Sequence, residues 1–138
     1  MELSNINFLA LAVAAIASFA LGAIWYSPLL FAKTWQKSVG LTDEKLIGAN
    51  MALIFGASFI LIFLMDFGLA VILQGHAGRD VSMLSGALYG SLIGLFFVAT
   101  SIGINMLYQR KSFTLWAIDA GYQVIYLAIS GAILGAWR

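Results

Sequence analysis

Long apolar stretches alternate with short polar connections along this chain. Four stretches contain almost no charged side chains, at about residues 6–27, 46–73, 82–107 and 114–136. Each reaches the roughly 20 residues that an α-helix needs to cross the ~30 Å hydrocarbon core of a bilayer. Lipid cannot satisfy exposed backbone hydrogen-bonding groups, so each span has to be helical. The pattern predicts an all-α, polytopic membrane protein in which residues 1–138 form one four-helix transmembrane domain.

Polar residues at the start of each stretch predict where the helices begin. The expected N-caps are Ser4 or Asn5, Thr42, Asp80, and Ser112 or Thr114. The second connection, residues 74–80, is short and rich in glycine, which predicts an antiparallel hairpin between the second and third spans.

The first connection contains a corner and a short amphipathic helix. Pro28 lacks a backbone N–H and restricts the residue before it, so it is expected to stop or kink the first helix. Phe31, Trp35 and Val39 then recur at four-residue spacing. This spacing predicts a short helix lying on the cytoplasmic membrane surface. Trp25, Pro28, Phe31 and Trp35 are therefore expected to form a membrane-exit corner.

Basic residues are unevenly divided between the connections. The first and third contain Lys33, Lys37, Lys45, Arg110 and Lys111, whereas the other side has only Arg79 and Arg138. Basic residues favour the cytoplasmic side of short loops, which predicts that both termini lie outside. No Lys or Arg precedes the first apolar stretch, so it is interpreted as a retained span rather than a secretory signal.

The composition narrows the class of protein and its partners. Hydrophobic residues make up 62% of the 138 residues and charged residues only 9%, too few to cover a soluble surface. Cysteine is absent, which excludes disulfides and thiolate metal sites. A net charge of +1 argues against nucleic acid as a partner. The expected surroundings are the lipid bilayer and other membrane helices.

Small residues at four-residue spacing form ridges on several predicted spans. The most regular ridge is Gly86, Gly90 and Gly94 in the third span. Ala10, Ala14, Ser18 and Gly22 form another in the first span, and Gly48, Ala52 and Gly56 form one in the second. Such ridges allow helix backbones to approach closely in lipid. The spacing leaves open whether the glycine ridge of the third span packs within the bundle or across subunits.

The last span has two special faces. One is polar and contains Asp119, Tyr122, Gln123, Tyr126 and Ser130. The other is small and contains Gly121, Gly131 and Gly135. A helix that faces lipid broadly needs neither, so protein is expected on both sides of this one. In a single four-helix unit this implies neighbours from another subunit, and it predicts a homo-oligomer.

Asp66 and Asp119 are the acidic residues inside the spans, where a charged carboxylate is costly. Counting along the helices places Tyr26, Asn50 and Asn105 at about the depth of Asp119. Together with Tyr122, Gln123 and Tyr126 they form a candidate polar layer, either an ion, proton or headgroup site or a network that pins the helices. Asp66 is a second intramembrane acid, and its expected partner is Tyr89 or Tyr126.

No arrangement of residues indicates catalysis, a metal or a cofactor. His76 and Asp80 lack a third ligand nearby, and Gly75 and Gly78 interrupt helical spacing between them. No serine lies in a nucleophile-elbow pattern. The expectation is a protein that is not an enzyme.

Three strings resemble the family catalogued as domain of unknown function 1761: GAIWYSPLLFAKTW, GLFFVATSIGIN and IDAGYQVIYLAISGAILGAW. The matching residues are Gly22, Trp25, Tyr26, Pro28, Phe31, Trp35, Asn105, Asp119, Gly121 and Tyr122. The resemblance implies a small four-helix protein of the bacterial inner membrane and no established activity. A histidine is expected in many relatives where this chain has Gln123, so a relay through a titrating histidine is not implied there.

Two functions fit these observations. One is an oligomeric channel or carrier for an ion or small solute that uses the polar stripe of the last span. The other is a non-catalytic accessory or scaffolding subunit that binds another membrane protein through the small-residue ridges and the amphipathic segment.

Overall fold

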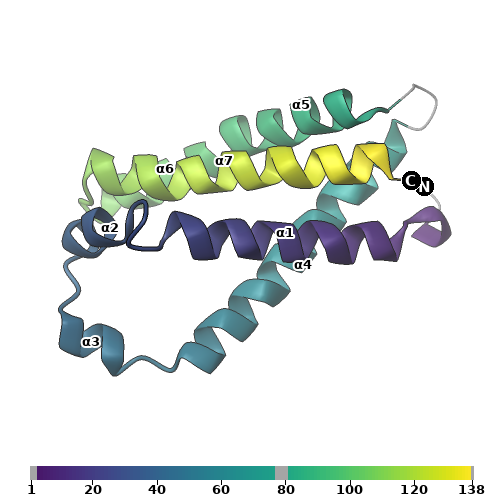
Figure 1. Ribbon diagram of the computed structural model, residues 1–138. Helices are drawn as coiled ribbons and strands as arrows, with labels where there is room; N and C mark the ends of the chain where they lie inside the picture. Colours follow the sequence, from purple (N-terminus) through teal and green to yellow (C-terminus); the bar gives the residue numbers. More distant parts are fainter. Residues whose placement is uncertain (1–2, 77–80, 138) are drawn as a thin grey trace.

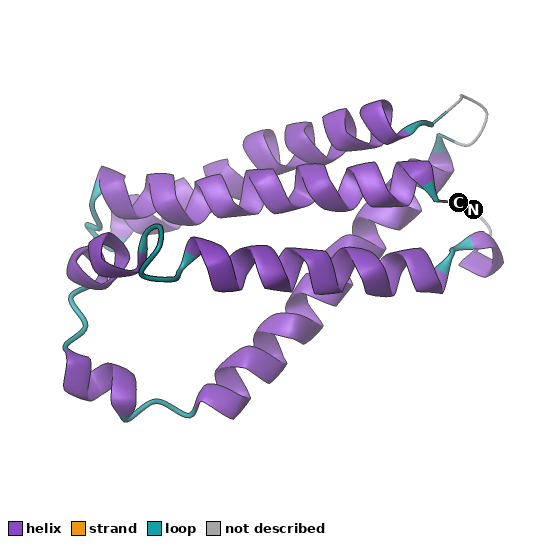
Figure 2. Ribbon diagram, in the orientation of Figure 1, coloured by secondary structure: helices purple, strands orange, loops and turns teal. Residues whose placement is uncertain are grey.

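The computed structural model describes residues 3–76 and 81–137. Within these residues, four helical stretches are long and apolar enough to cross a membrane: Phe8–Trp25, Met51–Gly75, Met83–Tyr108 and Phe113–Ala136. The described part contains no strand (Figures 1 and 2). The expectation of an all-α protein with four spans is therefore confirmed.

Helical elements follow one another along the chain with short connections. In order they are η1 (Leu3–Asn5), α1 (Phe8–Trp25), α2 (Ala32–Val39), α3 (Asp43–Ile47), α4 (Met51–Gly75), α5 (Met83–Ile93), η2 (Gly94–Ala99), α6 (Thr100–Tyr108) and α7 (Phe113–Ala136). The third span runs through α5, η2 and α6, and η2 is a π-helical segment. The short helix expected after the first span is α2, which ends at Gly40 in the left-handed conformation, with φ of 80°.

Side-chain caps explain where the first and last spans begin. α1 is capped by Asn7, whose Oδ1 accepts from the N–H groups of Leu9 and Ala10 at 3.1 and 3.0 Å. The expected cap at Ser4 or Asn5 is wrong, because these residues belong to the separate turn η1. α7 is capped by Ser112, whose hydroxyl accepts from the N–H of Leu115 at 3.2 Å.

The second span begins later than its apolar pattern suggests. Thr42 caps the short helix α3, and Asn50 then caps α4 by accepting from the N–H of Leu53 at 3.1 Å. Leu46 and Ile47 extend the apolar pattern but belong to α3. The third span is capped by Ser82, which forms a capping box with Ser85. The expected cap at Asp80 lies outside the described residues.

α7 lies at the centre of the bundle. It contacts α1, α2, α4, α5, η2 and α6, most extensively α5. One chain therefore encloses its own last helix on both faces. Because the chain's own helices enclose α7, its two special faces no longer imply a second subunit. The reason given above for expecting a homo-oligomer is therefore removed.

α4 joins the bundle with only part of its length. It crosses obliquely, and its N-terminal half diverges together with α3 (Figure 1). Residues 51–57 are all exposed, whereas Asp66, Leu69 and Leu73 in the C-terminal half are buried. This end of α4 packs mainly against α1 and α7.

Glycines bring α5 and α7 into backbone contact. A β-carbon on Gly90 would collide with the carbonyl oxygen of Leu127, and one on Gly86 would collide with that of Gly131. A β-carbon on Gly94 would lie 2.8 Å from Val124 Cα. Gly135 packs equally closely on Ser82. The glycine ridge of the third span therefore packs within the chain, which resolves the alternative left open by the sequence.

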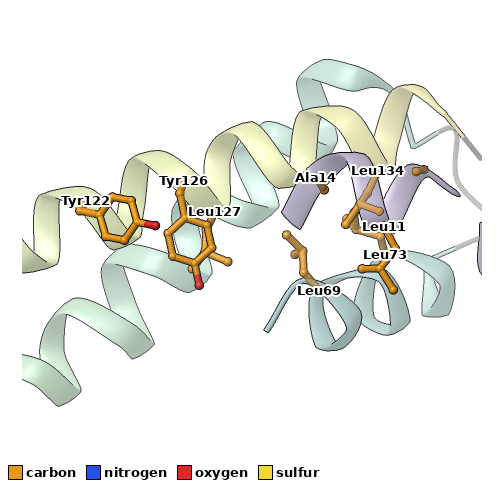
Figure 3. Close-up of a cluster of buried hydrophobic side chains, with 9 residues drawn as sticks. Leu11, Ala14, Leu69, Leu73, Tyr122, Tyr126, Leu127 and Leu134 are labelled. Carbon is orange, nitrogen blue, oxygen red and sulfur yellow. The ribbon is translucent and has the colours of Figure 1, made fainter. Parts of the chain in front are cut away.

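The buried core runs along the interior of α1, α4 and α7. It contains Tyr122, Tyr126 and Leu127 toward one end and Leu11, Leu69, Leu73 and Leu134 toward the other (Figure 3). We call the last four residues the leucine layer. The core is thus tyrosine-rich in one region and purely apolar in the next.

Candidate functional site

The chain leaves α1 through a tight turn that contains Pro28. Tyr26 caps α1, and its N–H donates to the carbonyl of Gly22 at 3.0 Å. The N–H of Phe31 then donates to the carbonyl of Trp25 at 3.1 Å, and the two rings lie 4.8 Å apart. This turn aims Tyr26 toward α7.

Trp25 is attached to α7 rather than only lying at the membrane surface. Its Nε1 donates to the carbonyl of Ile118 at 3.0 Å. Its ring covers Gly121, where an added β-carbon would come within 3.3 Å of the indole. The first and last spans are thereby locked together beside Asp119.

Tyr26 and Asp119 form a direct hydrogen bond across these two spans. The Tyr26 hydroxyl donates to Asp119 Oδ1 at 2.7 Å. The Trp35 indole also approaches this carboxyl, and the rings of Tyr26 and Trp35 lie 5.9 Å apart. Burial, and after it the bond to Asp119, raises the pKa of Tyr26 above its ordinary value, so the hydroxyl remains a donor.

A row of tyrosines leads from this pair into the bundle. Tyr122 lies 5.5 Å from Tyr26 and 5.2 Å from Tyr126, measured between ring centroids. The hydroxyl of Tyr122 donates to the carbonyl of Ser18 at 2.9 Å, and that of Tyr126 donates to Met65 Sδ. Tyr122 and Tyr126 follow one another along α7 in Figure 3.

Asp66 lies at the inner end of this row and has no geometrically defined hydrogen bond to any residue among 3–76 and 81–137. Its exposure is 0%, and neither carboxyl oxygen makes a hydrogen bond. Ser130 lies close enough to interact with the carboxyl, and its Oγ also pairs with Ser18 Oγ at 2.8 Å, a bond in which either hydroxyl can be the donor. A buried polar group without a partner costs about 1–3 kcal/mol. Such a group in a native structure requires an explanation, and function is one.

The partners expected for Asp66 are otherwise engaged. Tyr126 is close enough to interact electrostatically with the carboxyl, but its hydroxyl points to Met65. Tyr89 stacks on His76, with ring centroids 5.0 Å apart. The predicted interhelical hydrogen bond to Asp66 is therefore absent from the described residues.

The candidate polar layer is smaller than the sequence suggests. Asn50 is exposed at the start of α4, where it acts as a cap, and Asn105 is exposed on α6. Gln123 is half-buried, and its Oε1 has no hydrogen-bond partner among the described residues. The structure thus joins Tyr26 and Asp119 directly, extends the row through Tyr122 and Tyr126, and leaves both asparagines outside it.

A second polar feature lies beyond the leucine layer. A pocket of about 230 Å³ opens near the chain termini and is lined in part by Leu73, Gln74, Leu134 and Trp137. Both amide atoms of Gln74 lack hydrogen-bond partners among the described residues. Gln74 lies eight residues after Asp66 on α4, so Leu69 and Leu73 separate the two polar groups.

Ser18 is the functional candidate that the sequence did not single out. It lies in the small-residue ridge of the first span, where a serine is expected for its small size rather than for its hydroxyl group. The only sequence signal is that Ser18 and Ser130 are hydroxyls in two spans that both carry small-residue ridges.

Metal ligands do not gather in this site. Residues 3–76 and 81–137 contain no group of three or more His, Asp or Glu side chains placed to hold a metal. His76 Nδ1 lies 2.9 Å from the carbonyl oxygen of Ile72. Asp80, its suggested companion, is outside the described residues.

The fold and the polar row define a polytopic membrane protein with four spans and a fully buried acid in its core. The chain belongs to the family described as "Protein of unknown function (DUF1761)", whose model matches residues 9–135. No curated protein and no solved structure matches the chain. The family resemblance drawn from the sequence is confirmed.

Proposed function

We propose that this protein moves protons across the bilayer and that Asp66 binds the transported proton. The observation that carries this proposal is the fully buried Asp66 carboxyl in the C-terminal half of a membrane span, whose oxygens make no hydrogen bond within the part of the chain that the structure describes. Acidic residues inside spans commonly belong to proton relays. A proton is also the one cation that needs no cavity, so the tightly packed bundle does not exclude it.

A row of tyrosines lies on one side of Asp66 and the leucine layer lies on the other. Tyr126, Tyr122 and Tyr26 lead from Asp66 to Asp119, with ring spacings of 5.2 and 5.5 Å. On the other side, the leucine layer separates Asp66 from the pocket at Gln74. Apolar constrictions gate permeation by excluding water. Opening of this layer would expose Asp66 to the pocket. On the other side, the hydroxyls of Tyr126 and Tyr122 donate to Met65 and Ser18, so they would have to turn toward Asp66 and Tyr26 to pass a proton along the row.

Orientation and membrane follow from the charge pattern and the family resemblance. With the basic connections in the cytoplasm, both termini lie outside and Asp119 lies toward the cytoplasmic end. The proposed location is the bacterial inner membrane. In this proposal the protein is a transporter rather than an enzyme, and it works as a monomer or as a homo-oligomer of independent units.

Proton flux in liposomes tests the proposal. Purified protein is placed in vesicles with a pH-sensitive dye inside, a pH gradient is imposed, and its decay is compared with that of empty vesicles. Wild type is expected to accelerate the decay, and Asp66→Asn to abolish the acceleration. Glu44→Gln is the matched control, because Glu44 is an exposed acid on α3 and its loss leaves the core unchanged.

Three outcomes would contradict proton transport through Asp66. Wild-type vesicles that hold the gradient as well as empty ones would exclude it. Equal flux through wild type and Asp66→Asn would exclude Asp66 as the binding group. Selective decay of a sodium gradient at constant pH would replace the proton with a metal cation.

The divergent half of α4 favours a second candidate, an accessory subunit. Residues 51–57 are exposed, with the Phe55 ring lying 5.9 Å from that of Phe19, and nothing lies within 4 Å of a β-carbon placed on Gly56. Gly48 lies at the end of α3, so only Ala52 and Gly56 of the expected ridge lie on α4, and their face is unpaired among the described residues. In this alternative the ridge binds a helix of another membrane protein.

Native mass spectrometry after extraction in mild detergent tests this candidate. A stoichiometric second protein that is lost from Gly56→Leu and retained by Gly68→Leu would support it; the control is apt because Gly68 also has nothing within 4 Å. A lone monomer, or a homo-oligomer unaffected by Gly56→Leu, would contradict it.

A further inference from the structure

An apolar pocket with a basic mouth lies where α6 passes into α7. The pocket has a volume of about 400 Å³, and its walls include Gly103, Ile104, Leu107, Phe113 and Trp116. It lies between the end of the third span and the start of the fourth, at the edge of the hydrocarbon region. Its walls therefore match an apolar chain, and its position gives access from the bilayer.

Two contacts fix the aromatic wall. Trp116 Nε1 donates to the carbonyl of Ala99 at 2.8 Å, at the end of the π-helical segment η2. Gly103 makes room for the indole, since an added β-carbon would lie 3.0 Å from Trp116 Nε1. Phe113 packs on Trp116 with ring centroids 5.3 Å apart. The indole N–H is thus already satisfied, and the pocket presents ring faces rather than a free donor.

The mouth is basic because of a turn with an unusual residue. The N–H of Arg110 donates to the carbonyl of Leu107 at 3.1 Å, and that of Lys111 donates to Met106 at 2.9 Å. These two bonds end α6 in the pattern that places a left-handed residue after the helix, usually glycine. Here that residue is Arg110, with φ of 56°. A non-glycine residue in this conformation is strained, and such strain often accompanies a binding site.

Positive charge at this mouth is not neutralised by the protein. Neither Arg110 nor Lys111 forms an ion pair with a described residue. Lys111 lines the pocket together with Ser112, the N-cap of α7, so the positive end of the α7 dipole points to the same place. A lysine in the pocket wall, an arginine adjacent to it in the sequence and a helix N-terminus are together complementary to one amphiphile, an acyl chain with an anionic headgroup.

We infer that this pocket binds an anionic phospholipid. One acyl chain lies against Ile104, Leu107 and Trp116, and the phosphate lies at Lys111 and Arg110. Basic pockets between transmembrane helices bind anionic headgroups in this way. The inference does not depend on proton transport, because the pocket is formed by α6 and α7 away from Asp66.

Lipid retention in native mass spectrometry tests the inference. The full-length protein is extracted from vesicles of phosphatidylglycerol and phosphatidylcholine in equal amounts, and its bound lipid is identified. Wild type is expected to retain phosphatidylglycerol preferentially. Each basic residue near a membrane strengthens the attraction about fivefold, so the double variant R110G/K111Q should bind about 25-fold more weakly.

Both the variants and the controls are chosen to leave the fold intact. Glycine suits the left-handed position of residue 110, so R110G relieves strain while it removes charge. K45Q is the matched control, because Lys45 is exposed on α3 and does not line the pocket. Ile104→Trp fills part of the cavity and should weaken lipid binding without removing charge.

Several results would overturn the inference. Equal retention of the two lipids by wild type would show that charge does not select the ligand. Equal retention of phosphatidylglycerol by wild type and R110G/K111Q would place the lipid elsewhere. Competition by inorganic phosphate as effective as that by the lipid would assign the site to a free anion rather than to an amphiphile.

Discussion

The two faces of α7 pack against their neighbours in different ways and through different residues. Toward α5 the helix has glycines, and the two backbones touch at Gly90 and Leu127 and at Gly86 and Gly131. Toward α1 and α4 it has tyrosines, a serine and an acid, and here hydrogen bonds replace close backbone packing. On the first face, glycines allow the two backbones to touch. On the second face, polar side chains make the contacts, and only some of them form hydrogen bonds.

This difference separates structure from proposed function. The glycine face leaves no space for even one methyl group, so it fixes the distance between α5 and α7. On the polar face, the Asp66 carboxyl is buried without a hydrogen bond to a described residue, which lowers the stability of the fold. Helix packing does not require this carboxyl. The face that costs stability is the one where activity is expected.

Gly90→Ala has the largest expected effect on stability. The new β-carbon would collide with the Leu127 carbonyl, so α5 and α7 must move apart. We expect a loss of about 3 kcal/mol, at the upper end for overpacking of a core. Equilibrium unfolding in mixed detergent micelles measures the change. Unaltered stability would show that the two helices are not in backbone contact.

Tyr26→Phe should have the next largest effect, this time on the polar face. The change removes the hydroxyl that donates to Asp119 at 2.7 Å and leaves the ring in place. Loss of a hydrogen bond to an acidic partner costs about 1.5–3 kcal/mol. Tyr89→Phe is the control, since the Tyr89 ring packs on His76. Equal losses in both variants would mean that the Asp119 bond contributes nothing specific.

Ser130→Ala should cost about 1 kcal/mol through loss of the bond to Ser18. The informative measurement is a double-mutant cycle of unfolding free energies with Ser18→Ala. Because the two hydroxyls bond each other at 2.8 Å, the double variant should lose little more than either single one. Strictly additive losses would show that the hydroxyls act separately.

Gly56→Ala should have the smallest effect and the opposite sign. Nothing lies within 4 Å of the added β-carbon, and the residue is in the exposed half of α4. Alanine in place of a helical glycine should add about 0.5–1 kcal/mol. A loss comparable to that of Gly90→Ala would mean that this ridge also packs closely against a partner.

Periodicity and length were sufficient to predict the four spans and the two faces of α7. Regular glycine spacing identified the ridge of the third span, but not that its partner would be the glycine face of the same chain's last helix. That choice depends on which helices are neighbours, and spacing within one helix contains no such information. The expected homo-oligomer rested on the two special faces of the last span, which the chain's own helices enclose.

Of the residues counted to the depth of Asp119, Tyr26 contacts it, whereas Asn50 and Asn105 are exposed. Tyr26 immediately follows a straight span beside α7, so counting placed it well. Asn50 caps α4 after the separate helix α3, and α6 extends beyond a π-helical segment. Capping and a change in helical pitch alter where a side chain points without changing the apolar pattern. Ser18 was overlooked because a serine in a small-residue ridge can act either as a small packing residue or as a hydrogen-bonding group.

Proton flux through Asp66→Asn, measured on a preparation whose unfolding free energy is also determined, tests the central claim most directly. Asparagine keeps the size of the side chain and removes the acid, so the protein should remain at least as stable as wild type while flux falls to that of empty vesicles. Wild-type flux in this variant, or a loss of flux that accompanies unfolding, would contradict the account of Asp66 as the proton-binding group.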